Sequence, residues 1–276
     1  MRAAVSRTDE RLETPVGTIQ LVRSGAGAPV VYLHSAGGET TNPPLEDLSA
    51  DHAVYVPVFP GFGESEGLEQ IDGMEDAVFH LLDVLDGLGL RSPAVIGLSL
   101  GGWMAAELAT RAPERVGRLV LASPVGLRIE AAPVPDLFGR RPGELAEDLY
   151  ADQSHPMAQM MHLLDDWVGD VTKMVDLPAG MLMPMVQSMA ATAKLGWNPY
   201  LHNPKLPGRL RRITAPTLVV AGAADRFTPR AHAEAYAAGI AGARLAVIEG
   251  AGHMVPMERP EEFTAVVREF LAATGG

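Results

Sequence analysis

Short apolar runs alternate along the chain with segments in which apolar residues recur at helical spacing. The runs predict strands, and those without interspersed polar residues predict strands buried on both faces of a sheet. The predicted strands span residues 18–24, 28–34, 52–59, 92–99, 116–124, 215–222 and 243–250. The predicted helices span residues 74–90, 101–113, 229–240 and 259–273. This alternation indicates an α/β fold with a mostly parallel central sheet flanked by helices.

The alternation stops between residues 127 and 208, where no clear strand pattern is present. We predict a mainly helical cap at 127–208, inserted between two parts of an α/β core at 1–126 and 209–276. Methionine is frequent in this insert, at Met157, Met160, Met161, Met174, Met181, Met183, Met185 and Met189. Because methionine fills irregular apolar space and adapts to varied ligands, the insert indicates a small hydrophobic substrate. The alternative is that most of these side chains pack the cap helices together.

Composition and charge exclude several classes of function. The 276 residues carry a formal net charge of -12, so we expect no nucleic-acid partner, which would require clustered Lys and Arg. The chain has no cysteine, which excludes disulfides and a cysteine nucleophile. No run reaches the ~18 apolar residues of a membrane span. The first residues lack the pattern of a signal peptide, so we expect a cytoplasmic protein.

A serine lies between two glycines where a predicted strand meets a predicted helix. The stretch Gly97-Leu98-Ser99-Leu100-Gly101 matches the pattern G-x-S-x-G in the strand–turn–helix context that this motif requires. Small neighbours let the backbone turn sharply, and Gly102 lets the following helix approach the sheet. The hydroxyl of Ser99 is therefore expected above the carboxyl end of the sheet, at a helix N-terminus that favours negative charge.

An acid and a base follow in the order that the motif demands. Asp225 comes directly after one predicted strand and His253 after the next, where open α/β sheets build their sites. Serine is a weak nucleophile at neutral pH and needs an imidazole to accept its proton. The imidazole in turn needs a carboxylate to hold its tautomer and stabilise its charged form. We therefore predict a catalytic triad of Ser99, His253 and Asp225.

With these residues in place, the sequence resembles the α/β-hydrolase fold family over nearly the whole chain except the insert. The resemblance is carried by VVYLHSAGGE, VFPGFGESEG, GLSLGG, APERVGRLVLASP, PTLVVAGAADRFTP and GAGHMVPMERPEEF. It implies an α/β-hydrolase fold with a cap and catalytic serine chemistry. These motifs do not specify a substrate.

The resemblance also implies an oxyanion hole. One donor would be the N–H of Leu100, directly after the nucleophile. The second would be the N–H of Ala36, in the loop after the strand that ends at His34. The family usually has glycine where this chain has Ser35, and that hydroxyl either faces the substrate or bonds local backbone. His34 is expected to support the loop rather than act as a base.

Four side chains are candidates for the substrate pocket, namely Ser35, Trp103, Trp197 and Met254. We expect no cofactor and no metal ion. Gly61 and Gly63 mimic the start of a dinucleotide fingerprint, but Glu66 stands where its third glycine belongs. A P-loop and an H-E-x-x-H zinc motif are also missing from the sequence.

Three functions compete at this stage. The first is a serine hydrolase that cleaves a carboxylic ester through an acyl-enzyme on Ser99. The second is a C–C bond hydrolase, because SPVGL and the capped layout resemble the meta-cleavage product hydrolases, although those usually carry an aromatic residue where this chain has Met254. The third is a non-hydrolytic ligand-binding or tailoring protein, against which the complete triad argues. The sequence leaves the oligomeric state open, a homodimer included.

Overall fold

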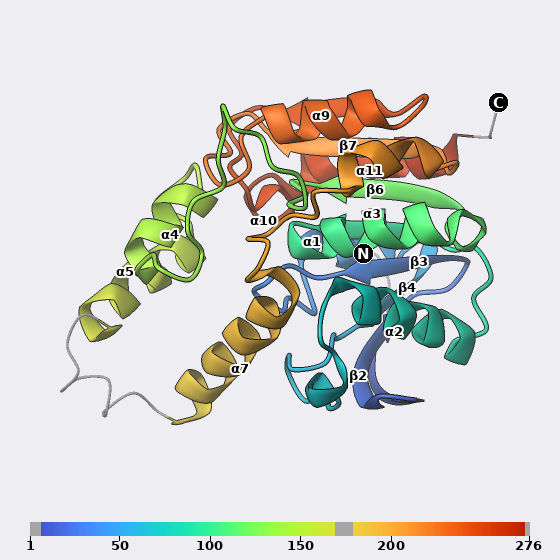
Figure 1. Ribbon diagram of the computed structural model, residues 1–276, viewed down its shortest axis with the longest axis horizontal. Helices are drawn as coiled ribbons and strands as arrows, with labels where there is room; N and C mark the ends of the chain where they lie inside the picture. The colour runs from blue at the N-terminus through green and yellow to red at the C-terminus, as the bar shows by residue number, and fades with distance from the viewer. Residues whose placement is uncertain (1–6, 169–178, 274–276) are drawn as a thin grey trace.

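The computed structural model describes residues 7–168 and 179–273, and within them an eight-stranded sheet forms the centre of the molecule (Figure 1). The strand order is β1-β2-β4-β3-β5-β6-β7-β8. The strands are β1 (Arg7–Thr14), β2 (Gly17–Ser24), β3 (Ala28–Leu33), β4 (His52–Pro57), β5 (Ala94–Leu98), β6 (Arg118–Ala122), β7 (Thr217–Gly222) and β8 (Arg244–Ile248). From β4 to β8 the pairing is parallel, while β1 and β2 pair antiparallel at one edge.

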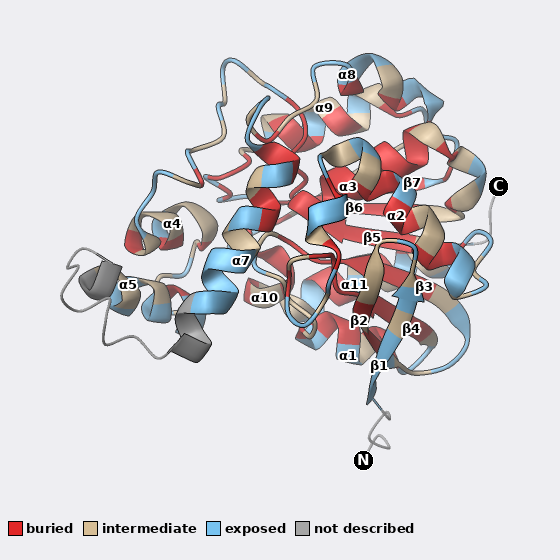
Figure 2. Cartoon of the chain, turned by 60° about the horizontal axis from the view of Figure 1, so that its bottom comes forward, coloured by how far each residue is buried: buried red, intermediate tan, exposed pale blue. Residues whose placement is uncertain are grey.

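Helices cover both faces of this sheet, as the strand–helix alternation predicts. They are α1 (Pro43–Leu48), α2 (Met74–Gly87), α3 (Leu100–Arg111), α9 (Ala231–Gly239), α10 (Val255–Glu258) and α11 (Pro260–Ala272). The buried side chains of α2, α3 and α9 join one hydrophobic core, and those of α1, α10 and α11 join a second. Successive residues of β6 alternate between the two cores, Leu119 and Leu121 facing one and Val120 the other. The sheet interior is accordingly buried (Figure 2).

The apolar pattern missed strand β1 and the short helices α1 and α10. The side chains of β1 are mostly exposed, and its polar sequence RTDERLET carries no strand-like alternation. Backbone pairing with β2, from Arg7 opposite Ser24 to Thr14 opposite Gly17, forms this strand. Its pairing therefore depends on tertiary context more than on its own residues.

The segment between β6 and β7 has helices and no strand in its described part. These helices are α4 (Pro142–Leu149), α5 (Pro156–Val168), α7 (Ala179–Gly196) and α8 (Leu206–Arg209). Figure 1 shows α4, α5 and α7 together on one side of the sheet. These are the helices that we predict to form the cap. The domain boundaries themselves stay a prediction.

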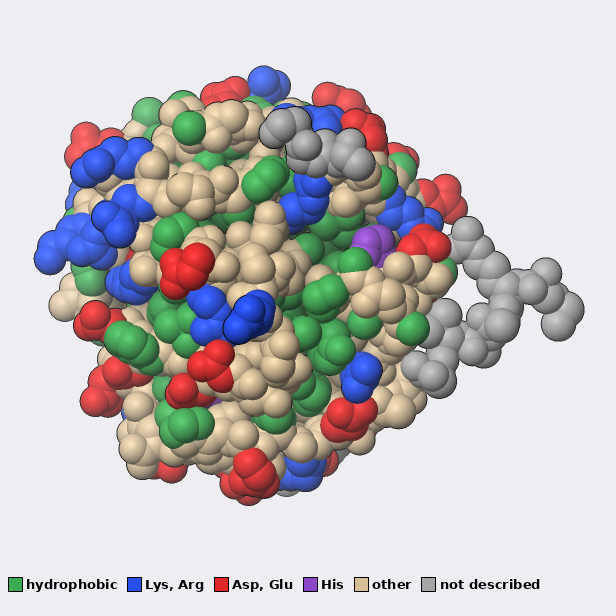
Figure 3. All heavy atoms as spheres, turned by 90° about the vertical axis from the view of Figure 1, so that its right-hand side faces the viewer, with side chains coloured by type: hydrophobic (Ala, Val, Ile, Leu, Met, Phe, Trp, Pro, Cys, Tyr) green, Lys and Arg blue, Asp and Glu red, His purple; other side chains and the backbone are tan. Residues whose placement is uncertain are grey.

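Charged side chains of both signs lie on the surface (Figure 3). On the face turned away from α4 and α5, basic and acidic side chains are interspersed (Figure 3). In the described ranges, no helix is both long and apolar enough to cross a membrane.

Candidate active site

Ser99 occupies a sharp turn between β5 and α3. Its backbone has φ 54° and ψ -110°, a conformation that is costly for a residue with a side chain. The flanking glycines make the turn sterically possible. A Cβ at Gly97 would lie 2.3 Å from the carbonyl oxygen of Gly101, and one at Gly101 would lie 2.1 Å from the carbonyl oxygen of Leu33. The G-x-S-x-G spacing is therefore explained by backbone-to-backbone contact on both sides of the serine.

The three residues of the predicted triad meet in one hydrogen-bonded chain. The Oγ of Ser99 lies 2.8 Å from Nε2 of His253, and Nδ1 of His253 lies 3.0 Å from Oδ2 of Asp225. The side chains of His253 and Asp225 are 1% and 0% exposed. Since Nδ1–H donates to the carboxylate, Nε2 is left as an acceptor for the serine proton. This is the geometry that activates a serine hydroxyl.

The buried carboxylate of Asp225 is held by two further backbone donors and one hydroxyl. Its Oδ1 accepts the N–H groups of Phe227 at 2.9 Å and Thr228 at 2.8 Å. Its Oδ2 accepts the hydroxyl of Thr228 at 2.8 Å, and that hydroxyl oxygen also lies 3.0 Å from Nδ1 of His253. These bonds compensate the buried charge and fix the direction of the carboxylate. Sequence reasoning missed Thr228, although its position three residues after the acid is a recognisable signal for a turn held by Asp.

We expect Thr228→Val to lower kcat/KM about tenfold for whichever substrate is turned over, because one hydrogen bond to an ionised group is lost while the shape is kept. Steady-state kinetics of the purified variant would measure this. Thr264→Val is the matched control, because Thr264 is similarly buried, lies in α11, and has a hydroxyl with no partner within the described part of the chain. Equal activity in the two variants would show that Thr228 does not position the triad.

The loop after β3 presents an unpaired backbone donor to the same site. The N–H of Ser35 donates to Oε2 of Glu39 at 2.9 Å, and the N–H of Gly37 donates to the Oγ of Ser35 at 2.9 Å. The N–H of Gly38 donates to the carbonyl oxygen of Ser35 at 3.1 Å. Among the hydrogen bonds of the described residues, the N–H of Ala36 has no acceptor. Of the amides at residues 35–38, it is the one left to donate a hydrogen bond to a substrate oxygen.

The second free donor is the N–H of Leu100. Leu100 is the first residue of α3, where an amide has no partner within its own helix. Ala36 and Leu100 both line the same cavity as Ser99. The structure thus places both residues of the expected oxyanion hole beside the nucleophile.

The two side chains before Ala36 hold this loop in place. The hydroxyl of Ser35 donates to Oε1 of Glu39, so it is engaged within the loop. Nδ1 of His34 lies 2.7 Å from the carbonyl oxygen of Ser35, and its Nε2 accepts the N–H of Phe59 at 3.0 Å. Burial lowers the pKa of His34, which keeps the imidazole neutral and able to accept. His34 therefore supports the loop, as expected from the sequence.

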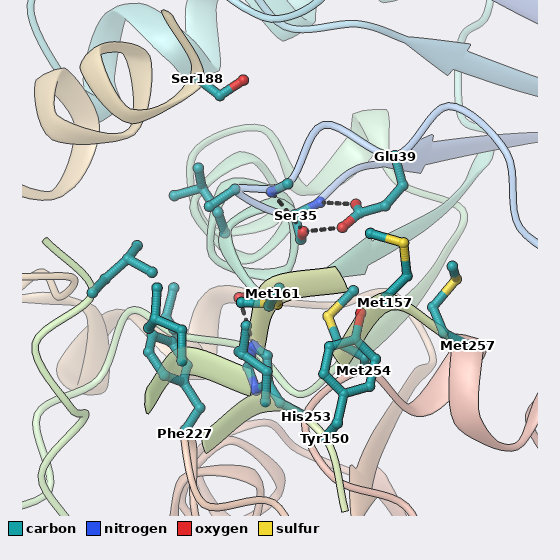
Figure 4. Close-up of a pocket in the computed structure, with 18 of the residues that line it drawn as sticks. Ser35, Glu39, Tyr150, Met157, Met161, Ser188, Phe227, His253, Met254 and Met257 are labelled. Carbon is teal, nitrogen blue, oxygen red and sulfur yellow. Dashed lines mark hydrogen bonds between the residues drawn. The ribbon is translucent and has the colours of Figure 1, made fainter. Parts of the chain in front are cut away.

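A cavity of about 370 Å³ opens above the triad (Figure 4). Its lining is mostly apolar and comes from the loop after β3, from the turn at Ser99 between β5 and α3 (the elbow), from α4, α5 and α7, and from the loop of His253. Four of the insert's methionines line it, Met157, Met161, Met185 and Met189. Met174 and the side chain of Met181 lie outside the described residues. Part of the methionine-rich insert therefore faces the site, as a pocket for an apolar substrate requires.

The structure corrects two of the four expected pocket residues. Ser35 and Met254 line the cavity, whereas Trp103 and Trp197 are not among its described lining residues. Trp103 is 2% exposed, and its Nε1–H donates to Glu107 at 3.0 Å within α3. Trp103 lies in the first turn of α3, and its side chain packs into the hydrophobic core instead of the cavity. Trp197 is 63% exposed at the end of α7 and packs against Phe138, with ring centroids 5.1 Å apart.

Glu39, Tyr150 and Phe227 are among the lining residues that the sequence analysis missed. The ring of Phe227 packs edge-on against the imidazole of His253, with centroids 4.8 Å apart.

In the described part of the chain, no group of three or more His, Asp or Glu side chains is arranged to hold a metal ion.

The comparisons with known proteins agree with this fold. The model of the alpha/beta hydrolase family matches residues 18–266. The chain belongs to the alpha/beta hydrolase family. The fold predicted from the sequence is thereby confirmed.

Its relatives in this family carry different names. A 2-hydroxy-6-oxononadienedioate/2-hydroxy-6-oxononatrienedioate hydrolase of Cupriavidus pinatubonensis is 30% identical over 90% of this chain and 88% of that protein. A dihydrolipoyllysine-residue acetyltransferase component of the acetoin cleaving system of Cupriavidus necator is 29% identical over 92% of this chain, which spans 66% of that protein. The crystal structure of a Bacillus subtilis carboxylesterase shares the fold with a TM-score of 0.71 and 23% identity, covering 98% of this chain and 93% of that one.

Proposed function

We propose that this alpha/beta hydrolase is a serine hydrolase that cleaves carboxylic esters of hydrophobic small molecules. The observation that carries the proposal is the buried chain of hydrogen bonds from Ser99 through His253 to Asp225, which opens on a mostly apolar cavity. An apolar cavity with a few convergent polar groups is typical of a site for a small apolar ligand.

The reaction follows from the placement of these groups. Ser99 attacks the ester carbonyl while His253 accepts its proton, and the carbonyl oxygen becomes an oxyanion held by the N–H groups of Ala36 and Leu100. His253 then donates the proton to the leaving alcohol, which departs as the acyl-enzyme forms. Water, deprotonated by His253, attacks the acyl-enzyme and releases the carboxylic acid. Asp225 holds the imidazole in the tautomer that each step needs.

A C–C bond hydrolase is the second candidate, and the name of the Cupriavidus pinatubonensis relative favours it. The substrate in that name is a dioate, which carries two carboxylates. Carboxylates bound in an apolar pocket need a cationic partner. The described lining of this cavity contains no Lys or Arg, and its acidic side chain is Glu39. This supports an uncharged ester over a dienoate.

A direct comparison tests the proposal. The purified chain is given p-nitrophenyl esters from acetate to octanoate and, separately, a 2-hydroxy-6-oxo-dienoate. We expect kcat/KM to be larger for the esters and to rise with chain length until the pocket is filled. Each buried methylene should lower the activation free energy by about 0.8 kcal/mol. Rapid cleavage of the dienoate without ester turnover would establish the second candidate instead. Saturable binding of esters without turnover would favour a ligand-binding protein.

A further inference from the structure

The cavity above the triad is lined by an acidic side chain that no cation of the described lining balances. Glu39 is the one carboxylate side chain in the described lining of this cavity, and that lining contains no Lys or Arg. Its carboxylate accepts the N–H and the hydroxyl of Ser35. Within the described ranges, none of the salt bridges includes Glu39.

The carboxylate is fixed in place rather than free to swing into solvent. Glu39 is half-buried, and Figure 4 shows its carboxylate turned toward Ser35, on the same side of the pocket as Met157. Both of its oxygens are tied to one residue of the loop that carries Ala36. The charge is therefore held on the loop that carries Ala36, in the lining of the cavity that Ser99 also lines.

The effect of this charge extends into the pocket. Burial raises the pKa of Tyr150, and the negative charges of Glu39 and Glu258 raise it further. The two acids differ in their surroundings. The carboxylate of Glu258 is buried and accepts the backbone N–H groups of Ala151, Asp152 and Gly252, and it is not among the described lining residues. Of these two acids, Glu39 is the one that lines the cavity.

We propose that Glu39 determines substrate charge specificity, so that the pocket accepts esters of uncharged acyl groups and rejects acyl groups that carry a carboxylate. The inference rests on the proposed ester hydrolysis. A substrate carboxylate in this cavity would lose its hydration without gaining a Lys or Arg partner from the described lining. It would also be repelled by the negative charge of Glu39. Repulsion between Glu39 and the oxyanion is common to all esters, so it cancels when two esters are compared on one enzyme.

Two esters of equal shape test this. Mono-p-nitrophenyl adipate ends in a carboxylate, and p-nitrophenyl 6-methylheptanoate replaces that carboxylate with an isopropyl group. We expect the wild-type protein to hydrolyse the neutral ester with a kcat/KM at least about tenfold higher. Failure to hydrolyse either ester would count against the proposed function, whereas equal rates on the two would overturn the role of Glu39 and leave ester hydrolysis standing.

Variants assign the selectivity to the charge. Glu39→Gln keeps an acceptor for the N–H of Ser35, and we expect it to raise the adipate-to-neutral ratio of kcat/KM about tenfold. Glu39→Ala, made in parallel, removes the charge without introducing an amide, and the ratio must rise in each of these variants that still turns over the neutral ester. Ser35→Ala is the matched control, because it loses the hydroxyl contact but keeps the carboxylate, and its ratio should stay within about twofold of wild type. A ratio that does not rise in the Glu39 variants, or that rises as much in Ser35→Ala, would overturn the proposal.

Discussion

Ser99→Ala should abolish ester hydrolysis, with kcat falling by about 10³–10⁶-fold. The reason is that the hydroxyl 2.8 Å from Nε2 of His253 is the atom that forms the acyl-enzyme. The residual rate would come from the oxyanion donors and from binding alone. Initial rates on a p-nitrophenyl ester, with the burst of the first turnover recorded, measure the loss directly.

A second buried serine serves as the control for this experiment. Ser123 lies directly after β6 and has a φ of 41°, and its hydroxyl has no hydrogen-bond partner among the residues that the structure describes. Ser123→Ala should therefore retain turnover and remain reactive toward a fluorophosphonate probe, whereas Ser99→Ala should lose both. Mapping of the probe to a residue other than Ser99 in the wild-type protein would refute the assigned nucleophile.

Gly101→Ala should lower the free energy of unfolding by about 3 kcal/mol or more and lower the melting temperature by about 5 °C. The added Cβ would lie 2.1 Å from the carbonyl oxygen of Leu33 and 2.6 Å from that of His34. Because both contacts are with backbone, no side-chain rotation relieves them, and either α3 or the end of β3 must move. That movement would also displace Ala36 and reduce activity. Thermal unfolding followed by circular dichroism gives the stability change.

Gly208→Ala is the matched glycine substitution. Gly208 lies in α8, and a Cβ there would meet no atom within 4 Å. Alanine is the better helix former by about 1 kcal/mol, so this variant should melt at or slightly above the parental temperature. If both variants melt within about 1 °C of the parent, the elbow tolerates a side chain at Gly101 and the steric explanation of its motif fails.

Much of the site is encoded in short stretches of sequence. The elbow is formed by backbone contacts among nearby residues and with the end of β3. Its glycines are required by these contacts, so the spacing of Gly97, Ser99 and Gly101 identifies the elbow in the sequence. Asp225 and His253 each follow a strand whose apolar run is visible, and parallel strands bring their carboxyl ends to one edge of the sheet. Neither step requires knowledge of how distant side chains pack.

The sequence by itself determined the α/β alternation, the elbow and the order of the triad, because these follow from local sterics and the periodicity of buried positions. Tertiary structure alone decided that β1 pairs at the sheet edge, that Trp103 turns into the core, and that Glu39 brings a negative charge to the pocket. Each of these depends on which surfaces from distant segments meet. The periodicity of one segment carries no information about the partner it packs against, and so the composition of the cavity could be known only once the chain was folded.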